Sequence, residues 1–320
     1  MCACPDILAA VARAVVAQPK IALVGAGRVG TALAVRLAEA GYKITELISR
    51  RTPNSRGKVR GLARRLRATA ANVAGAQLDA DIVWFCTPDE QIARTAVELA
   101  RLDWRRKFAF HASGFLTSDE LAVLHDQGAQ VASVHPLMTF VPGVVPKLAG
   151  VTFAVEGDPR AVRVATAIVR TLGGNVLRIR MQDKAAYHAF ATMVCPMLVS
   201  LLATAEKVGV LAGISPARAR QAMLPIIRQT VVNYEKLGSA KAFTGPIMRG
   251  DVATVGQHLS SLADGPAIEQ VYLALAQAAL QYLPICNPEG MDKMLHQTFS
   301  ATSAMSLPSR RSKTLTRRGR

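Results

Sequence analysis

The chain has 320 residues, 50% of them hydrophobic, and carries a formal net charge of +17 at neutral pH. This length allows two domains with substantial cores, and the hydrophobic content excludes an intrinsically disordered chain. We identify no apolar run of bilayer-crossing length and no basic stretch ahead of the first apolar residues, so we expect a cytoplasmic protein without membrane contacts.

The positive charge is concentrated in two segments that contain no acidic residue, residues 50–67 and residues 303–320. The second segment is rich in Ser, Thr and Arg, which is typical of a disordered, solvated tail. We therefore expect no specific nucleic-acid binding, with weak, salt-dependent contacts as the alternative. The five scattered cysteines have neither a disulfide framework nor a metal-ligand spacing, so we expect reduced thiols and no metal site.

A short amphipathic helix over residues 6–17 precedes a first strand, which runs into a glycine turn with the spacing G-x-G-x-x-G. In a dinucleotide site the first glycine makes the turn, the second admits the pyrophosphate and the third lets the helix pack on the strand. The pyrophosphate then lies at the N-terminus of the helix, which we expect to end near Ala40. The predicted cofactor-binding turn consists of Gly25, Ala26, Gly27, Arg28, Val29 and Gly30.

The end of the second strand, residues 43–49, indicates which dinucleotide binds. NAD sites usually place an acidic residue here for the ribose hydroxyls, whereas this chain has Ser49-Arg50-Arg51. A hydroxyl and two guanidinium groups suit a 2′-phosphate. We therefore predict NADP (NADPH) as the cofactor, and the alternative is an ordinary solvated basic loop.

Three further strands carry polar residues at their carboxyl ends, where open α/β sheets bind ligands. Thr87 and Pro88 are expected to lie against the nucleotide, and His111, Ser113 and His135 near the nicotinamide. The alternative is that the histidines only stabilise the core. These strands are expected at residues 81–86, 108–111 and 131–136, with a short helix at 117–127.

The pattern changes from strands to long helices near residue 180, after a strand at 151–156, a helix at 159–172 and a strand at 175–179. The predicted fold class is α/β, a Rossmann-type parallel-sheet domain followed by an all-helical C-terminal domain. Helices are expected at 182–211, 215–237, 251–263 and 266–283. The predicted divisions are an extension at 1–19, an NADP-binding domain at 20–180, a helical substrate and dimerisation domain at 181–302, and a basic tail at 303–320.

Two polar clusters lie in the helical part. Lys184 and His188 are four residues apart and share one helix face at the domain junction, where they can polarise a carbonyl and protonate its oxygen. The alternative is a solvent-facing lysine and a histidine near the helix end. In the loop Thr244–Asp251, Arg249 can bind a substrate carboxylate while Asp251 caps the next helix, or the two can pair and only shape the loop.

The glycine turn and five other segments together resemble the short-subunit dehydrogenase-like oxidoreductases, a Rossmann family with a C-terminal helical domain of unknown function. More distantly, the chain is similar to ketopantoate reductase, pyrroline-5-carboxylate reductase and the β-hydroxyacid dehydrogenases. The resemblance implies hydride transfer from NADPH, homodimers through the helical domain and a catalytic role for Lys184. A departure is Cys195-Pro196, where such families often carry Asn, and Pro196 is expected to kink the helix. The other segments are Thr87-Pro88-Asp89, His111 to Gly114, His135 to Phe140, Lys184 to His188 and Thr244 to Asp251.

Our sequence-based hypothesis is an NADP-dependent oxidoreductase that reduces the carbonyl of a small 2-oxo acid, with ketopantoate as one candidate. Lys184 and His188 would polarise the carbonyl and protonate its oxygen, while Ser113 and Arg249 position the substrate. One alternative is an imine reductase similar to pyrroline-5-carboxylate reductase. Another is a non-catalytic NADP-binding sensor or scaffold.

Overall fold

The computed structural model of the protein describes residues 18–49 and 53–305. The chain divides into two compact units, Met1–Cys195 and Pro196–Arg320. The helix expected at 6–17, the pair Arg50-Arg51 and most of the basic tail lie outside the described residues. The division between the units falls within the helix that was expected to open the second domain.

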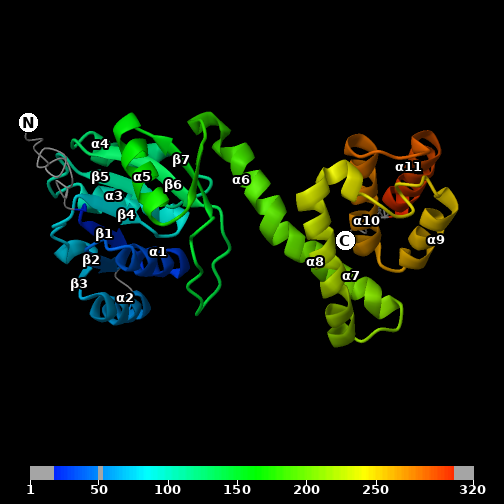
Figure 1. Cartoon of the computed structure of the whole chain (residues 1–320), viewed down its shortest axis with the longest axis horizontal. Coiled ribbons are helices and arrows are strands. Elements are labelled where there is room, and N and C mark those ends of the chain that lie inside the picture. Colours follow the sequence, from blue (N-terminus) through cyan, green and yellow to red (C-terminus); the bar gives the residue numbers. More distant parts are fainter. Residues whose placement is uncertain (1–17, 50–52, 306–320) are drawn as a thin grey trace, which may run out of the picture. The chain divides into compact units, whose positions relative to one another are not determined.

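The first unit is built on an eight-stranded sheet with the order β3-β2-β1-β4-β5-β6-β7-β8 (Figure 1). All neighbouring strands are parallel except β6 and β7, which are antiparallel. Its strands are β1 (Ile21–Val24), β2 (Ile44–Ser49), β3 (Thr69–Asn72), β4 (Ile82–Phe85), β5 (Phe108–His111), β6 (Gln130–Pro136), β7 (Thr152–Gly157) and β8 (Asn175–Arg178). The central strands are buried on both faces, which is why they read as continuous apolar runs in the sequence.

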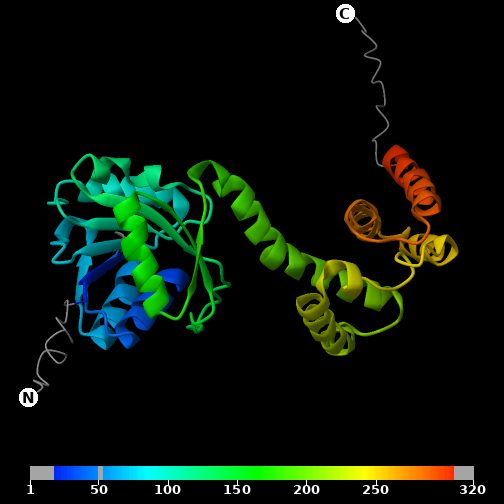
Figure 2. The same ribbon diagram turned by 45° about the horizontal axis from the view of Figure 1, so that its top comes forward.

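Helices cover both faces of this sheet, and each face has its own apolar core. On one face pack α1 (Arg28–Glu39), α2 (Pro53–Leu66) and α5 (Pro159–Thr171). On the other pack α3 (Asp89–Leu99) and α4 (Ala122–His125), with the short 3-10 turns η1 (Val73–Gly75) and η2 (Ser118–Leu121). Figure 2 shows α5 crossing its face of the sheet. The expected Rossmann-type fold, with a helical region after it, is confirmed.

Two elements of the first unit were missed in the sequence. Residues 50–67 were noted only for their basic charge, but they contain the whole of α2, and β3 follows at the edge of the sheet. In α2 the core contacts come from a few apolar residues such as Val59 and Leu62, set among many basic ones. So sparse an apolar stripe does not give a visible helical period.

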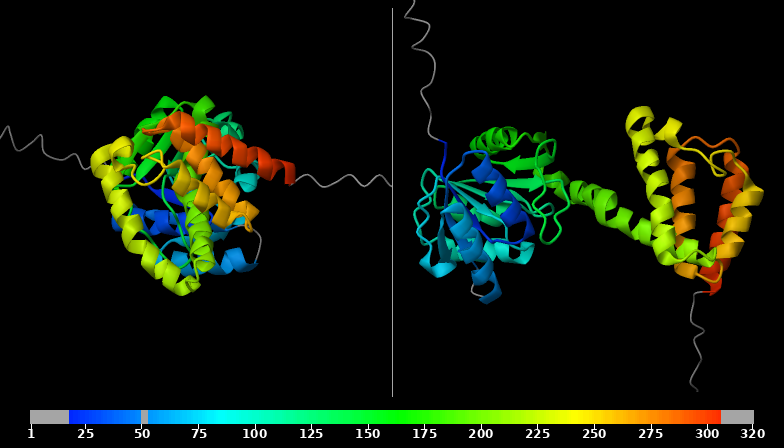
Figure 3. Two further views of the ribbon diagram at one scale, coloured as in Figure 1. Left: turned by 90° about the vertical axis from the view of Figure 1, so that its right-hand side faces the viewer. Right: turned by 60° about the horizontal axis from the view of Figure 1, so that its bottom comes forward.

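The second unit is helical throughout its described part. The helices α9 (Val252–Leu262), α10 (Pro266–Tyr282) and α11 (Pro288–Met305) lie alongside one another and share a small core (Figure 3). The helix α11 was not expected. In contrast, α7 (Leu198–Leu211) buries no residue, and α8 (Pro216–Ala242) buries only Ala219.

A continuous helical segment, Met181–Leu211, consists of a 3-10 turn, α6 (Lys184–Thr192), a π turn at Met193–Met197 and α7. Pro196 lies inside the π turn, which accommodates its missing N–H at the expected point of interruption. The expectation that no apolar run reaches bilayer-crossing length was wrong, because this segment is long and apolar enough by length and composition. None of its most apolar window is buried in the protein.

Candidate functional site

The turn between β1 and α1 requires glycine at two of its three glycine positions. Gly25 has a φ of 99°, and a Cβ atom there would lie 2.8 Å from the carbonyl oxygen of Cys86. A Cβ atom at Gly30 would overlap the carbonyl oxygen of Gly25. The close approach of α1 to β1 and β4 is therefore possible only with these glycines.

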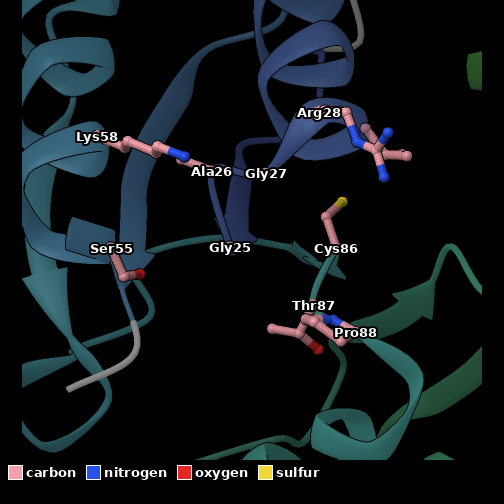
Figure 4. Close-up of a pocket in the computed structure, with 10 residues that line it drawn as sticks. Gly25, Ala26, Gly27, Arg28, Ser55, Lys58, Cys86, Thr87 and Pro88 are labelled. Atoms are coloured by element: carbon pink, nitrogen blue, oxygen red, sulfur yellow. The ribbon is translucent and has the colours of Figure 1, made fainter. Parts of the chain in front are cut away.

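A pocket opens over this turn, between the ends of β1 and β4 and the helix α2 (Figure 4). Because α1 begins after Gly27 without a side-chain cap, the N–H groups of its first turn are free to bind an anion. Figure 4 shows Arg28 and Lys58 on opposite sides of the turn, so two cations flank these N–H groups. The donors fit a dinucleotide pyrophosphate with an additional phosphate. The pocket is lined by Gly25, Ala26, Gly27, Arg28, Val29, Ser55, Lys58, Cys86, Thr87 and Pro88.

The structure places Thr87 and Pro88 in the pocket at the glycine turn, and their contact with a nucleotide stays a prediction. The basic side of the pocket differs from the expectation. Ser49 is only 2% exposed, and its hydroxyl donates to the Ala71 carbonyl at 3.1 Å, so the expected phosphate contact is not supported. Arg50 and Arg51 lie outside the described residues and stay a prediction. Ser55 and Lys58 were missed. They are three residues apart on α2, a signal that was lost because no helix was predicted in this segment.

His111, at the end of β5, is fully buried and uses both ring nitrogens within the protein. Its Nε2 lies 2.9 Å from the Thr117 carbonyl, and Ser113 N–H donates to Nδ1 at 3.2 Å. These partners fix the neutral tautomer with hydrogen on Nε2, and burial lowers the pKa of His111 to about 3. The expected contact between His111 and a substrate is therefore not supported.

The hydroxyl of Ser113 is also committed to the loop that follows β5. It donates to Asp89 at 2.8 Å and accepts from the N–H groups of Phe115 at 3.2 Å and Leu116 at 2.9 Å. The residue is 5% exposed. Its geometry supports a role in shaping this loop rather than the expected catalytic contact.

Lys184, the first residue of α6, is 2% exposed. Its Nζ donates to Ser133 Oγ at 2.6 Å and to the Ser113 carbonyl at 3.0 Å. Burial lowers the pKa of Lys184 to about 8, although the charges of Glu156 and Asp89 act to raise it. The ammonium group thus joins α6 to the ends of β5 and β6 and places a buried charge beneath this edge of the sheet.

Above Lys184 lies a second layer of polar groups. His135 Nδ1 is 2.7 Å from Tyr187 Oη, and the two rings meet edge to face at 5.6 Å. A Cβ atom on Gly114 would lie 2.9 Å from both His135 Nε2 and His188 Cδ2, so a larger residue there would have to displace the two imidazoles. The rings of His188 and Phe115 are 5.9 Å apart. His135 and His188 are half-buried.

Tyr187 is the site residue that sequence analysis missed in this layer. It lies three residues after Lys184 and therefore shares a helix face with Lys184 and His188, a signal that was available in the sequence. Burial raises the pKa of Tyr187 to about 12. Burial lowers the pKa of His135 to about 4, with the charges of Lys184 and His188 acting in the same direction.

In the second unit, Asp251 caps α9, accepting hydrogen bonds from Thr254 N–H at 3.0 Å and from Thr254 Oγ1 at 2.7 Å. Arg249 is exposed, and both carboxylate oxygens of Asp251 accept from Thr254 rather than from Arg249. The structure therefore favours the capping role expected for Asp251. Contact between Arg249 and a substrate carboxylate stays a prediction. In the described part of the chain, no group of three or more His, Cys, Asp or Glu side chains is placed to hold a metal ion.

Comparisons with known families agree with the pocket at the glycine turn. Residues 20–109 match the model of a family described as NADP oxidoreductase, coenzyme F420-dependent. This match, over part of the chain, indicates an NADP-dependent oxidoreductase with a Rossmann-type domain. Residues 151–279 match a domain of unknown function, DUF2520. The match over residues 20–109 confirms the expected enzyme class, an oxidoreductase, and the expected cofactor, NADP.

Solved structures share the fold of this NADP oxidoreductase. A candidate NADP oxidoreductase from Bacteroides fragilis is 24% identical with a TM-score of 0.68, covering 81% of this chain and 97% of that one. An imine reductase from Pseudomonas sp. is 18% identical with a TM-score of 0.57, covering 87% and 99%. A pyrroline-5-carboxylate reductase from Coxiella burnetii is 15% identical with a TM-score of 0.54, covering 91% and 99%. No curated protein matches the chain.

Proposed function

We propose that the protein reduces the carbonyl group of a small 2-oxo acid with NADPH. The observation that carries this proposal is the order of four adjacent parallel strands, β1, β4, β5 and β6. Their carboxyl ends lie along one edge of the sheet, so the glycine turn after β1 and the polar layer around His135 lie on the same edge, with the ends of β4 and β5 between them. A dinucleotide with its phosphates at the turn has this polar layer within reach of its other end.

In this proposal the cofactor phosphates bind the N–H groups at the start of α1, flanked by Arg28 and Lys58. Arg50 and Arg51 would add further positive charge for a 2′-phosphate, which favours NADPH over NADH. Bound NADPH supplies the hydride. The chain supplies orientation, charge and a proton.

Lys184 acts in this proposal through its charge. Its two hydrogen bonds to Ser133 and Ser113 keep it beneath the site, where the positive charge stabilises negative charge that develops on a carbonyl oxygen above it. His188 is half-buried on the same helix face and is therefore more exposed than Lys184. Lys184 is thus a positioning and electrostatic residue.

A second candidate function is reduction of a carbon–nitrogen double bond. The structural likeness to an imine reductase and to a pyrroline-5-carboxylate reductase favours it, because both names describe C=N substrates. The same edge of the sheet would serve, with the proton delivered to nitrogen. A non-catalytic NADP sensor is the third candidate, and the half-buried histidines beside a flanking tyrosine argue against it.

We also propose that the protein works in the cytoplasm as a homodimer formed through its second unit. The support is the apolar surface of α7 and α8, where Val199 is 62% and Ile226 is 68% exposed. Exposed apolar surface of this extent is typical of an interface.

The function is tested by titrating the purified full chain with NADPH and NADH, and by following NADPH oxidation with two substrate panels. One panel contains small 2-oxo acids and the other contains cyclic imines. We expect tighter binding of NADPH and turnover on the first panel. Turnover on the imines alone would select the second candidate. NADPH binding without turnover on either panel would select the sensor.

A further inference from the structure

The hydrogen bonds of Lys184 do not explain which group gives the proton that the reduction needs. Reduction of a carbonyl needs one proton for each hydride, and the group that gives it must touch the substrate. Lys184 is 2% exposed and donates to two groups inside the protein. Among the neighbouring groups, Tyr187 and His135 form a hydrogen-bonded pair close enough for the charge of Lys184 to act on His135.

The bond between Tyr187 and His135 can run in either direction, since a neutral imidazole carries its proton on one nitrogen only. When Nδ1 of His135 carries the proton, it donates to Tyr187 Oη across 2.7 Å. The hydrogen of the Tyr187 hydroxyl is then free to point toward another acceptor. In this state the pair carries two exchangeable protons, one on the Tyr187 hydroxyl and one on His135 Nδ1.

We propose that Tyr187 is the proton donor of the reduction and that His135 restores its proton. As the hydride forms the new C–H bond, the C=O π bond breaks and its electron pair takes the hydrogen of the Tyr187 hydroxyl. As the phenolate oxygen takes the Nδ1 proton of His135, Nε2 of the same ring takes a proton from solvent, so the imidazole stays neutral throughout. The products are the hydroxy acid and NADP⁺. With an imine substrate, nitrogen accepts the same proton.

The charges around the pair favour this neutral relay. The titratable groups that face it are Lys184 and His188 on α6 and His111 on β5, while Glu156 and Asp89 act on Lys184. The cationic form of Lys184 disfavours a second positive charge on His135. It also stabilises the transient phenolate on Tyr187, since opposite charges attract more strongly at a buried site.

Gly114, in the loop after β5, supplies an independent geometric argument. Because Gly114 has no side chain, His135 Nε2 and His188 Cδ2 lie in the space that a methyl group would need. His135 therefore lies with Nε2 beside Gly114 and Nδ1 against the Tyr187 hydroxyl. This orientation aligns Nδ1 with the tyrosine hydroxyl.

The test compares Tyr187→Phe with the matched control Tyr42→Phe. Both tyrosines are 7% exposed and lie in the first unit, but Tyr42 packs in the apolar core at the amino end of β2. For Tyr187→Phe we expect kcat to fall at least about 100-fold, with little change in KM or in the Kd for NADPH. For Tyr42→Phe we expect the wild-type kcat. Equal kcat values for Tyr187→Phe and the wild type would overturn the proposal.

A second measurement does not depend on turnover. Tyrosinate absorbance of the free protein is followed with pH in the wild type, in His135→Phe and in Tyr187→Phe. We expect one high-pH transition to be absent in Tyr187→Phe and displaced in His135→Phe, because the phenol has lost its hydrogen-bond partner. If the tyrosinate titration of His135→Phe equals that of the wild type, Tyr187 and His135 are not hydrogen-bonded as proposed. This result does not depend on the catalytic activity of either variant.

This inference rests on the proposed reductase function, and the outcomes separate the two. NADPH binding by the wild type with no turnover on either panel would reject the reductase function and the proton donor together. Turnover by the wild type that persists in Tyr187→Phe would reject only the proton donor.

Discussion

Lys184 Nζ donates to the hydroxyl of Ser133 across 2.6 Å, although the two residues are 51 positions apart in the chain. This bond joins the first turn of α6 to β6, and the bond to the Ser113 carbonyl extends the link to the loop after β5. A charged group buried in this way is costly unless its hydrogens are satisfied. The residue that sequence suggests as a catalytic lysine is therefore first of all a buried anchor.

Replacement of Lys184 with Met separates its charge from its bulk. We expect turnover to fall at least about 10-fold, because the stabilising charge beneath the site is lost. The Kd for NADPH should change less than twofold, since Lys184 lies beneath the ends of β5 and β6 and the glycine turn follows β1. Steady-state kinetics and cofactor titration measure the two effects. Lys147→Met, which removes an exposed lysine, is the control, and equal turnover in the two variants would contradict this role.

The pH dependence of turnover follows from the same residue. Burial lowers the pKa of Lys184 to about 8, so its charge is present below pH 8 and is lost above it. We expect kcat/KM to decline as pH rises through about 8, and this alkaline limb to be absent in Lys184→Met. A profile of kcat/KM against pH for both proteins gives the result. The same limb in Lys184→Met would assign it to another group.

The stability of the first unit should decrease at mildly acidic pH because of His111. Its pKa is about 3 in the folded protein, against an unperturbed value of 6.5. Between these values the unfolded chain binds the proton and the folded one does not, so stability is lost as pH falls below 6.5. We expect the free energy of unfolding to drop by about 1–2 kcal/mol from pH 6.5 to 5.

Urea unfolding at several pH values measures this slope in the wild type, in His111→Asn and in His125→Gln. His125 is a half-exposed histidine on α4 and serves as the control. The slope should be smaller in His111→Asn and unchanged in His125→Gln. Identical slopes in all three proteins would show that His111 does not cause the acid sensitivity.

The preference for NADPH is tested at Lys58. Its side chain lines the pocket at the glycine turn, and an ammonium group there favours an additional phosphate. Lys58→Ala should raise the Kd for NADPH about 10-fold or more, with a much smaller effect on NADH. Arg60→Ala, on the same helix but outside this pocket, should leave both values unchanged. Equal weakening of the two cofactors by Lys58→Ala would argue for a pyrophosphate contact.

The sequence was sufficient for the Rossmann core because its signals are local. The glycine turn and the apolar strands each lie within a few residues, and they predicted β1, β4 and β5 closely. The burial of Lys184 was not predictable, since its partners come from positions 51 and 71 residues away. Likewise, the pairing of Tyr187 with His135 depends on how α6 packs on β6. Tertiary contacts of this kind leave no period in the sequence.

The last prediction concerns the apolar surface of α7 and α8, which carries exposed residues such as Val199 and Ile226. If a second copy covers this surface, charge introduced there should prevent association, because an unpaired carboxylate is costly to bury. We expect the wild type to have the mass of a dimer by light scattering, and Val199→Glu/Ile226→Glu to have the mass of a monomer. NADPH binding by the first unit should persist in this variant. A monomeric wild type that sediments with phospholipid vesicles would instead assign the apolar segment Met181–Leu211 to a membrane.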